Sequence, residues 1–483
     1  MRFVLDGQSV SVANLPASTT VLDYLRNIAQ RTGTKEGCAE GDCGACTVVL
    51  GELKADGQQI HYRAINSCIR FLPTIDGQEL VTVESLAADG VLHPVQQAMV
   101  DYHASQCGFC TPGFVMSLFA LYLNEPSPDR EQVLETLSGN LCRCTGYRPI
   151  IEAGCQMGSY PKPAHWSRDE VSSAARCAAL RAIQREAALQ LPDFVAPRSR
   201  QELAAALEAN PAALVLAGGT DVGLWVTKQL RELGPIVYVG EVAELRLASS
   251  DAQGLSIGAA VPLSEAWELI LKSYPELTEL ALRFASPPVQ NSGTLGGNVA
   301  NGSPIGDSMP ALMALGAQVE LQRGTVVRRV ALEQLYLGYQ RKDLAPGEFL
   351  VRVLIPPPKA GQWLASYKIS KRFDQDISAV CAAFALQIEN ARVVAARIAY
   401  GGMAAIPSRA AAAEQALLGQ SWNEATLEQA MDALASDFKP LSDMRASSTY
   451  RLHTARQLLR RFYLEHSDAP QASRAQQAAA VAP

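Results

Sequence analysis

The sequence predicts a multidomain protein of the α+β class. With 483 residues, the chain is longer than a single hydrophobic core normally supports, so several domains are expected. Short apolar runs that alternate as strands do are interrupted, from Pro94 to about residue 158, by a stretch with helical periodicity. The hydrophobic fraction of 48% and the charged fraction of 19% are typical of folded globular domains.

Charge and hydropathy exclude several classes of function. The net charge is −6, and no run of lysines or arginines could follow a phosphate backbone, so no nucleic-acid partner is expected. No apolar run approaches the ~20 residues of a membrane-spanning helix, and the first six residues do not open a signal peptide. We therefore expect a cytoplasmic protein that does not contact a membrane.

The first 84 residues predict a small α+β domain around one loop rich in cysteine and glycine. The expected elements are a hairpin at 3–12 turning at Asp6-Gly7, a helix at 21–30 capped by Thr19 or Thr20, and a strand at 47–50 that turns at Gly51. Helices are then expected at 95–102, 114–123 and 130–137.

The rest of the chain divides by composition. Strand-like runs alternate with glycine-rich turns and helices from Phe194 to about residue 360, and two strands around a turn at Asn390 precede helices that end near residue 465. The expected domains are 1–86, 87–158, 193–362 and 363–466, with a linker at 159–192 and a disordered tail at 467–483.

Eight of the 11 cysteines fall into two groups before residue 145, which favours metal ligation over disulfides. The first group has the C-x4-C-x2-C spacing, with one remote cysteine, of plant-type 2Fe-2S sites. It comprises Cys38, Cys43, Cys46 and Cys68. Loop glycines permit positive φ and close backbone approach, and they are Gly37, Gly41 and Gly44. Zinc is the alternative, although zinc favours paired C-x2-C knuckles.

The second group lies in QCGFCTPGF and GNLCRCTGYRP and comprises Cys107, Cys110, Cys142 and Cys144. Cys110 precedes Thr111 and Pro112, so we expect its thiolate at a helix N-terminus, where the dipole stabilises negative charge. Alone, these four could bind zinc, but the C-x-C pair and the neighbouring cluster loop favour a second 2Fe-2S site. The remaining cysteines are expected in the core: Cys155, Cys177 and Cys381.

Two glycine-rich segments could cradle a pyrophosphate. LVLAGGTDVG is a strand that runs into glycines before a helix, and TLGGNVANGSPIGD offers a second set of backbone N–H groups. The first segment is not G-x-G-x-x-G and follows no visible βαβ repeat, so a Rossmann domain is not favoured. Each segment alone could equally be an ordinary glycine turn.

The order of these motifs, with QCGFCTPG and CRCTGYRPI after the C-x4-C-x2-C loop, closely resembles the molybdenum hydroxylases, the xanthine dehydrogenase and aldehyde oxidase family. The likeness covers about residues 1–155 and 195–465. It implies, in chain order, a β-grasp plant-type ferredoxin domain, an all-helical 2Fe-2S domain, an FAD-binding domain of the vanillyl-alcohol-oxidase type and a C-terminal α+β flavoprotein domain.

The resemblance also implies contacts to FAD. The first pyrophosphate loop would be Val215, Leu216, Ala217, Gly218, Gly219, Thr220, Asp221 and Val222, and the second Thr294, Leu295, Gly296, Gly297 and Asn298. Asp307 would lie near the phosphate and ribose, Phe284 and Leu350 against the isoalloxazine ring, and Lys368 near the flavin. Without the resemblance, Phe284 and Leu350 would be assigned to core packing. Gln106 and Cys144 would face the molybdopterin of a partner.

In this family the large molybdenum-cofactor domain follows, so we expect it on a separate large subunit, as in split bacterial xanthine dehydrogenases, within a heterotetramer of two small and two large subunits. Electrons from hydroxylation of hypoxanthine to xanthine to urate would pass from that partner through the second and then the first cysteine group to FAD and NAD. No residue that hydroxylates purines is expected on this chain. The alternatives are a subunit of an aldehyde- or N-heterocycle-oxidising relative, or a zinc-stabilised scaffold without activity.

Overall fold

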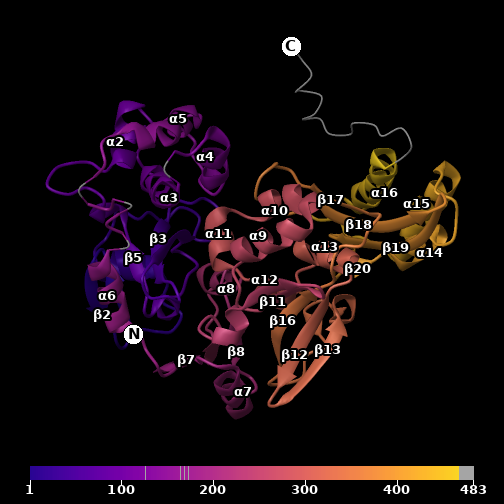
Figure 1. Ribbon diagram of the computed structural model, residues 1–483, viewed down its shortest axis with the longest axis horizontal. Coiled ribbons are helices and arrows are strands. Elements are labelled where there is room, and N and C mark those ends of the chain that lie inside the picture. Colours follow the sequence, from indigo (N-terminus) through magenta and orange to yellow (C-terminus); the bar gives the residue numbers. More distant parts are fainter. Residues whose placement is uncertain (126, 164, 168, 172, 467–483) are drawn as a thin grey trace. The chain divides into compact units, whose positions relative to one another are not determined.

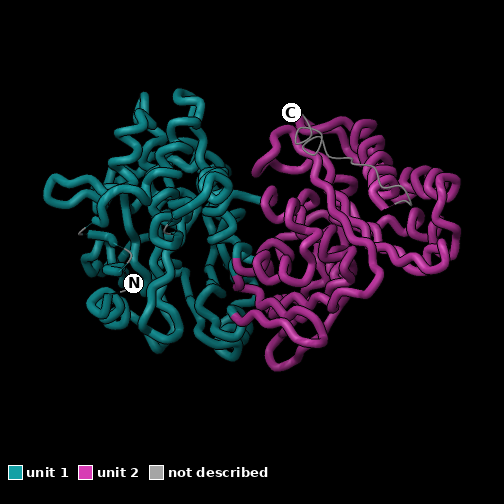
Figure 2. The backbone as a smooth tube through the Cα atoms, turned by 45° about the horizontal axis from the view of Figure 1, so that its top comes forward, with its two compact units in different colours: residues 1–246, 262–264, 285–294 teal, residues 247–261, 265–284, 295–483 magenta. Residues whose placement is uncertain are grey.

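The computed structural model describes residues 1–125, 127–163, 165–167, 169–171 and 173–466. The chain forms two units (Figure 2): residues 1–246, 262–264 and 285–294 make the first, and residues 247–261, 265–284 and 295–483 the second. The expected disordered tail, 467–483, lies outside the described residues. None of the described helices is both long and apolar enough to cross a membrane.

The first unit contains two sheets and a group of helices (Figure 1). Its strands are β1 (Arg2–Leu5), β2 (Gln8–Ser11), β3 (Thr47–Leu53), β4 (Ile60–Asn66), β5 (Glu79–Val81), β6 (Leu189–Leu191), β7 (Phe194–Ala196), β8 (Leu214–Leu216) and β9 (Ile236–Tyr238). Its helices are α1 (Val21–Asp23), α2 (Pro94–Asp101), α3 (Thr111–Asn124), α4 (Arg130–Leu137), α5 (Arg148–Gln156), α6 (Ala174–Ile183), α7 (Arg200–Ala209), α8 (Val222–Thr227) and α11 (Pro287–Ser292).

The amino-terminal sheet has the strand order β2-β1-β5-β3-β4, with β1 and β5 parallel. The predicted hairpin is confirmed, and both turn residues, Asp6 and Gly7, have positive φ. Two local predictions were wrong. Gly51 does not end a strand but pairs with Tyr62 inside β3, and the helix expected at 21–30 is α1 followed by a π-helical turn, Tyr24–Ile28. Thr20 caps it as predicted, because its hydroxyl accepts the N–H of Asp23 at 3.0 Å.

β1 and β3 bury side chains on both faces of this sheet, which explains their continuous apolar runs. Val4 and Val49 point into one core, which they share with Phe114 of α3. Their neighbours in sequence point into another core: Phe3 and Val48 pack there with Phe194 and Leu216 of the second sheet. The ferredoxin-like sheet therefore lies between the helical region and the second sheet.

The segment expected as a linker contains the ten-residue helix α6. α6 packs against β1 and β3, and Arg176 pairs with the buried Glu79 at 2.8 Å and covers the ring of Trp166 at 3.7 Å. The alanine-rich amphipathic sequence predicted no particular surface on which this segment would pack. In the structure, α6 packs on the amino-terminal sheet.

The second sheet has the order β6-β7-β9-β8, in which β7 and β8 both run parallel to β9. Helices α7 and α8 connect these strands, so the chain does contain a βαβαβ arrangement before the second glycine-rich segment. This arrangement was not visible in the sequence. Strands of three residues are too short to show a periodicity in sequence.

The second unit holds the remaining sheets. Its strands are β10 (Ala248–Asp251), β11 (Gly254–Gly258), β12 (Gln318–Arg323), β13 (Val326–Ala331), β14 (Tyr336–Gly338), β15 (Arg341–Lys342), β16 (Phe349–Ile355), β17 (Gln362–Ile369), β18 (Val380–Glu389), β19 (Arg392–Gly401) and β20 (Ser408–Arg409). Its helices are α9 (Leu263–Ser273, which starts in the first unit), α10 (Thr278–Phe284), α12 (Leu295–Asn301), α13 (Ser308–Leu315), α14 (Ala411–Leu417), α15 (Glu424–Asp437) and α16 (Ser448–Glu465).

Two antiparallel sheets organise this unit. One has the order β10-β11-β16-β12-β13, and α12 packs against its β11 and β16. The other has the order β17-β18-β19-β20, and α13, α14 and α16 cover it around Phe384, Tyr400 and Phe462. The predicted turn at Asn390 is confirmed, since Asn390 and Ala391 both have positive φ between β18 and β19.

We predict that acid loosens the helical region through His93. Its side chain is 1% exposed, and burial lowers its pKa to about 4. Nδ1 accepts the N–H of Val95 at 3.3 Å, so protonation there removes the cap of α2. Below pH 6.5 the unfolded state binds a proton that the folded state does not, so the opening free energy of α2 and α3 should fall by about 3 kcal/mol as the pH drops to 4.

Amide hydrogen exchange of α2 and α3 between these pH values measures this loss. His93→Gln should remove most of the pH dependence, whereas His61→Gln, at an exposed position, should leave it. An equal pH dependence in the His93 variant and the unchanged chain would contradict the assignment.

Candidate functional site

The structure brings the four cysteines of the first group together in the first unit. Cys46 and Cys68 are buried, with their sulfur atoms 3.2 Å apart. Cys38 and Cys43 are half-buried, and Cys38 forms hydrogen bonds with both Cys43 and Cys68. The remote cysteine therefore joins the loop, as the spacing predicted.

Backbone N–H groups also point at these sulfur atoms. The N–H groups of Glu40 and Cys43 donate to Cys38 Sγ at 3.4 and 3.3 Å. Gly44 has φ of +70°, and at Gly37 an added Cβ would lie 2.8 Å from Cys43 Sγ. A side chain at Gly37 would thus occupy the space of a ligand sulfur.

Hydrogen bonds among these four thiols shift their pKa values in opposite directions. Hydrogen bonds with Cys43 and then Cys68 lower the pKa of Cys38, while the bond with Cys38 raises the pKa of Cys43. The bond with Cys68 lowers the pKa of Cys46, and those with Cys38 and Cys46 raise the pKa of Cys68. Four thiolates at this spacing repel one another unless a cationic centre lies among them. The set fits a 2Fe-2S cluster, which needs four thiolates and N–H donors to sulfur.

The second cysteine group is more exposed. Cys107 and Cys144 are exposed and hydrogen-bonded to each other, and Cys110 and Cys142 are half-buried and likewise bonded. Burial opposes ionisation of Cys142, but hydrogen bonds from the Thr145 hydroxyl and N–H lower its pKa. These two pairs supply the same four-thiolate donor set as the first group.

Cys110 is the N-cap residue of α3, at the helix N-terminus that the sequence predicted. Stabilisation of its thiolate by the helix stays a prediction. Burial, followed by the hydrogen bond with Cys142, raises the pKa of Cys110 to about 12. Burial first, and the neighbouring thiols second, therefore oppose ionisation of Cys110, against a helix-dipole contribution of only about 0.3–1 kcal/mol.

The other cysteines lie as predicted in or against cores. Cys177 and Cys381 are buried, and Cys155 is half-buried against the helical core. Gln106, predicted to face a partner, is exposed beside Cys107.

The two cysteine groups are in direct contact. The N–H of Leu141, one residue before Cys142, donates to the carbonyl of Cys43 at 3.0 Å. The side chain of Asn140 also reaches this loop, donating to the carbonyl of Gly44 at 3.2 Å. Sequence analysis missed Asn140, although it lies within the GNLCRC motif, because nothing in that motif shows where its amide points.

The first glycine segment, residues 215–222, follows β8 and leads into α8. Gly219 has φ of +74°, and only two atoms come near its missing Cβ, at 3.7 Å. Gly218 has a different role, because a Cβ there would overlap the carbonyl of Ser292. The backbone that leads into the second glycine segment, 294–298, therefore packs directly on the first segment.

α8 also contacts the first cysteine group. Gly223 begins this packing, since a Cβ there would lie 2.6 Å from the carbonyl oxygen of Ile69, which follows Cys68. At the other end of α8, the hydroxyl of Thr227 donates to the carbonyl of Ala39 at 2.7 Å. The glycine segment is thus attached to both sides of the first cysteine loop.

The second glycine segment is not a simple turn. Residues 295–298 form the first turn of α12, and a Cβ at Gly296 would overlap Ala259 next to β11. Asn298 accepts a hydrogen bond from the Ser308 hydroxyl at 2.5 Å. Close packing therefore accounts for the glycine at position 296 without a ligand.

Asp307 and Lys368, assigned by resemblance to FAD contacts, form a buried ion pair at 2.8 Å. Lys368 also donates to the carbonyl of Arg283 at 2.7 Å, and Ser378 donates to Asp307 at 2.6 Å. This pair joins α13 to β17. Sequence analysis missed Ser378, whose position in a loop carried no signal.

The two predicted ring contacts differ in burial. Leu350 is 7% exposed and pairs with Leu321 in the sheet, which matches core packing. Phe284 is half-buried, 5.8 Å from the ring of Trp267. Contact of either side chain with a flavin stays a prediction.

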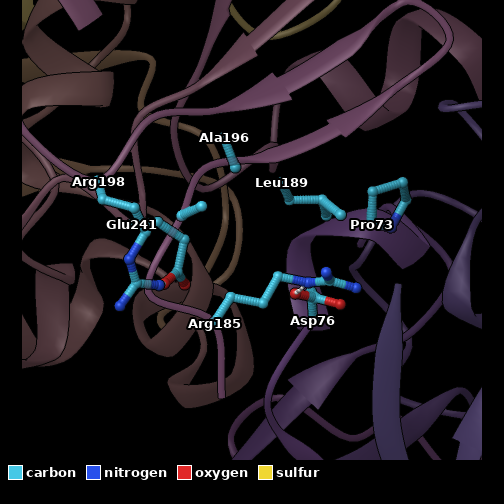
Figure 3. A pocket seen from close by; sticks show the side chains of 8 residues that line it. Pro73, Asp76, Arg185, Leu189, Ala196, Arg198 and Glu241 are labelled. Atoms are coloured by element: carbon cyan, nitrogen blue, oxygen red, sulfur yellow. Dashed lines mark hydrogen bonds and ion pairs between the residues drawn. The ribbon is translucent and has the colours of Figure 1, made fainter. Parts of the chain in front are cut away.

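A small pocket in the first unit contains none of the predicted site residues (Figure 3). Its charged side chains neutralise one another, since Arg185 pairs with Asp76 and Arg198 with Glu241, each at 2.7 Å. Its other lining residues are Pro73, Ala187, Leu189 and Ala196.

Four family profiles match successive parts of the chain. The profile for the 2Fe-2S iron-sulfur cluster binding domain matches residues 3–71, and that for the 2Fe-2S binding domain matches 82–155. The FAD binding domain in molybdopterin dehydrogenase matches 187–358, and the CO dehydrogenase flavoprotein C-terminal domain matches 365–466. The chain belongs to the molybdenum hydroxylase family. The predicted cofactor domains, two for 2Fe-2S clusters and one for FAD, are confirmed.

The chain is also similar in sequence to several xanthine dehydrogenases. Xanthine dehydrogenase from Emericella nidulans is 30% identical over 96% of this chain and 38% of its own length, and xanthine dehydrogenase 2 from Arabidopsis thaliana is 31% identical over 87% and 36%. The chain thus spans 36–38% of the length of these relatives.

Solved structures also match part of the chain. Carbon monoxide dehydrogenase from Hydrogenophaga pseudoflava is 28% identical with a TM-score of 0.53, covering 56% of this chain and 94% of that one. Quinoline 2-oxidoreductase from Pseudomonas putida 86 is 31% identical with a TM-score of 0.50, covering 56% and 94%.

We predict that Cys43→Ser removes one of two reduced-cluster EPR signals and leaves FAD bound. Serine lacks the thiolate that the first cluster requires, whereas the glycine segments stay intact. Cys155→Ser should retain both signals and serves as the control. Two distinct signals in the Cys43 variant would contradict the assignment of the first group.

We predict that Gly219→Val weakens FAD binding about tenfold or more, because a β-branched residue at positive φ costs about 1–2 kcal/mol and adds bulk to the loop. The measurement is flavin content after dialysis against a series of FAD concentrations. Gly234→Val, at a site with no atom within 4 Å of the missing Cβ, should bind FAD normally. Normal FAD content in the Gly219 variant would refute this role.

Proposed function

We propose that this chain is the iron–sulfur and flavin subunit of a xanthine dehydrogenase. Electrons from the oxidation of hypoxanthine to xanthine and of xanthine to urate, at a molybdenum cofactor on a partner subunit, would pass through the chain to NAD. The xanthine dehydrogenases that align along 87–96% of the chain support this choice of substrate. In this proposal the chain provides the route for the electrons, and purine hydroxylation takes place on the partner subunit.

The position of the first cysteine group carries the proposal. Its loop bonds to the second cysteine group on one side, through Leu141 and Cys43, and packs on α8 and the first glycine segment on the other. A cluster held there has the second cluster and the proposed FAD cradle as its immediate neighbours. These contacts support the expected order, from second cluster to first cluster to FAD.

The two 2Fe-2S clusters and FAD would have different roles in electron transfer. A 2Fe-2S cluster exchanges one electron, whereas NAD accepts two electrons with a proton, and a bound flavin can do both. The residues of this chain hold the groups in sequence and limit their contact with water. Cys46 and Cys68 are buried, so the first cluster is shielded, while the exposed Cys107 and Cys144 leave the second one accessible.

That exposure supports a partner at the second cysteine group. Gln106, Cys107 and Cys144 are exposed, together with the apolar side chain of Phe109. We propose that the molybdenum-binding large subunit covers this surface, in an assembly of two small and two large subunits. Electrons would then enter at the second cluster.

A second candidate is a subunit of another molybdenum hydroxylase that oxidises an aldehyde or an N-heterocycle. The likeness to quinoline 2-oxidoreductase, at 31% identity, favours it specifically. In that case the same relay would serve a different large subunit, and the partner would determine the substrate.

The purified chain should be brown and contain about four irons per FAD, the content of two 2Fe-2S clusters. Adding NADH should bleach its visible spectrum by reverse electron flow. Assembled with the large subunit, it should reduce NAD with hypoxanthine and xanthine. Turnover of N-heterocycles or aldehydes but not of purines would select the second candidate. A colourless, zinc-containing chain that cannot be reconstituted with iron and sulfide would overturn both.

A further inference from the structure

The loops of the two cysteine groups meet at a buried contact that we call the loop bridge, formed by Gly44, Gly113, Ser117, Gly139 and Asn140. Gly44 directly follows Cys43, and Asn140 lies two residues before Cys142. Each side of the loop bridge is therefore within two residues of a proposed cluster ligand. Both sides belong to the first unit.

Asn140 connects three parts of this contact with one side chain. It is 3% exposed, its amide nitrogen donates to the carbonyl of Gly44 at 3.2 Å, and its amide oxygen accepts the hydroxyl of Ser117 at 2.7 Å. Ser117 lies on α3, the helix that begins after Cys110. The amide thus links the first cysteine loop, the second one and the helix between them.

The bond to Gly44 is not needed to satisfy its carbonyl group. That oxygen already accepts the N–H and the hydroxyl of Thr47, at 3.1 and 2.7 Å. A carbonyl has two lone pairs, so these bonds use its capacity. The additional bond from Asn140 therefore acts mainly by holding the loops in one relative position.

The backbones on either side leave no room for adjustment. A Cβ at Gly44 would overlap the carbonyl of Gly139, and one at Gly113 would overlap the carbonyl of Gly44. Close-packed backbone of this kind transmits a shift of one loop to the other. The side chains of Asn140 and Ser117 can be changed here without adding bulk, and Asn140 is the one that bonds to Gly44.

We propose that Asn140 is a positioning residue that sets the spacing and orientation of the two clusters relative to each other. The proposal rests on the proposed function in requiring both clusters to be present. Magnetic interaction between two reduced clusters depends steeply on their separation, so it reports this role directly. A residue that only stabilised the fold would not alter it.

The test is EPR spectroscopy of the full-length chain, fully reduced with dithionite, with iron content measured in parallel. Asn140→Ala should keep both cluster signals and full iron content but lose the splitting caused by their interaction. The control is Asn124→Ala, which removes a different side-chain amide, at the end of α3, that also donates to a backbone carbonyl, that of Tyr62 at 3.2 Å. It should keep the splitting.

Asn140→Asp covers the case in which the alanine variant does not fold. It preserves shape and the acceptor for Ser117, but it places a carboxylate oxygen against the carbonyl of Gly44, so the splitting should again change. Both signals with an unchanged splitting in a folded Asn140 variant would overturn the proposal while leaving the proposed function intact. Absence of two cluster signals in the unaltered chain would overturn both.

Discussion

Repulsion between crowded thiolates is the constraint around which the first unit is organised. Cys38, Cys43, Cys46 and Cys68 are close enough to share protons, so some of their pKa values fall while others rise. Only a cationic centre lets all four ionise together, and backbone N–H groups that donate to Cys38 support the same charge distribution. The glycines of the loop are there because a side chain at Gly37 would displace a sulfur atom.

The other two proposed cofactor sites of the first unit, the second cysteine group and the first glycine segment, lie next to this loop. The amino-terminal sheet is apolar on both faces, so the helical region packs on one side and the second sheet on the other. Each neighbour brings one site to the loop: the helical region brings the second cysteine group, and the second sheet brings the first glycine segment. Because the sheet fixes both, no long connection is needed to keep the three sites adjacent.

Motifs that bind a group directly could be predicted from the sequence, because their spacing reflects covalent geometry. The two cysteine groups and the two glycine segments were predicted in this way. The cofactor domains that contain them are confirmed, whereas the roles of their individual residues remain predictions. Features set by packing could not be predicted. One such feature is the close approach of the Gly218 backbone to that of Ser292, which leaves no space for a side chain at position 218. Others are the packing of α6 on the amino-terminal sheet and the parallel pairing of the three-residue strands β7, β8 and β9. Each of these features depends on contacts with residues distant in sequence. The burial that raises the pKa of Cys110 also depends on such residues.

The central claim is that the first cluster lies between the second cluster and FAD. The most direct measurement delivers electrons to the bound flavin by photoreduction and follows the clusters by time-resolved absorption and EPR, in the unaltered chain and in Cys43→Ser. In the unaltered chain both clusters should become reduced after the flavin. In the variant, the flavin should still be reduced while the second cluster stays oxidised on the same timescale. Reduction of the second cluster at an undiminished rate without the first would contradict the account.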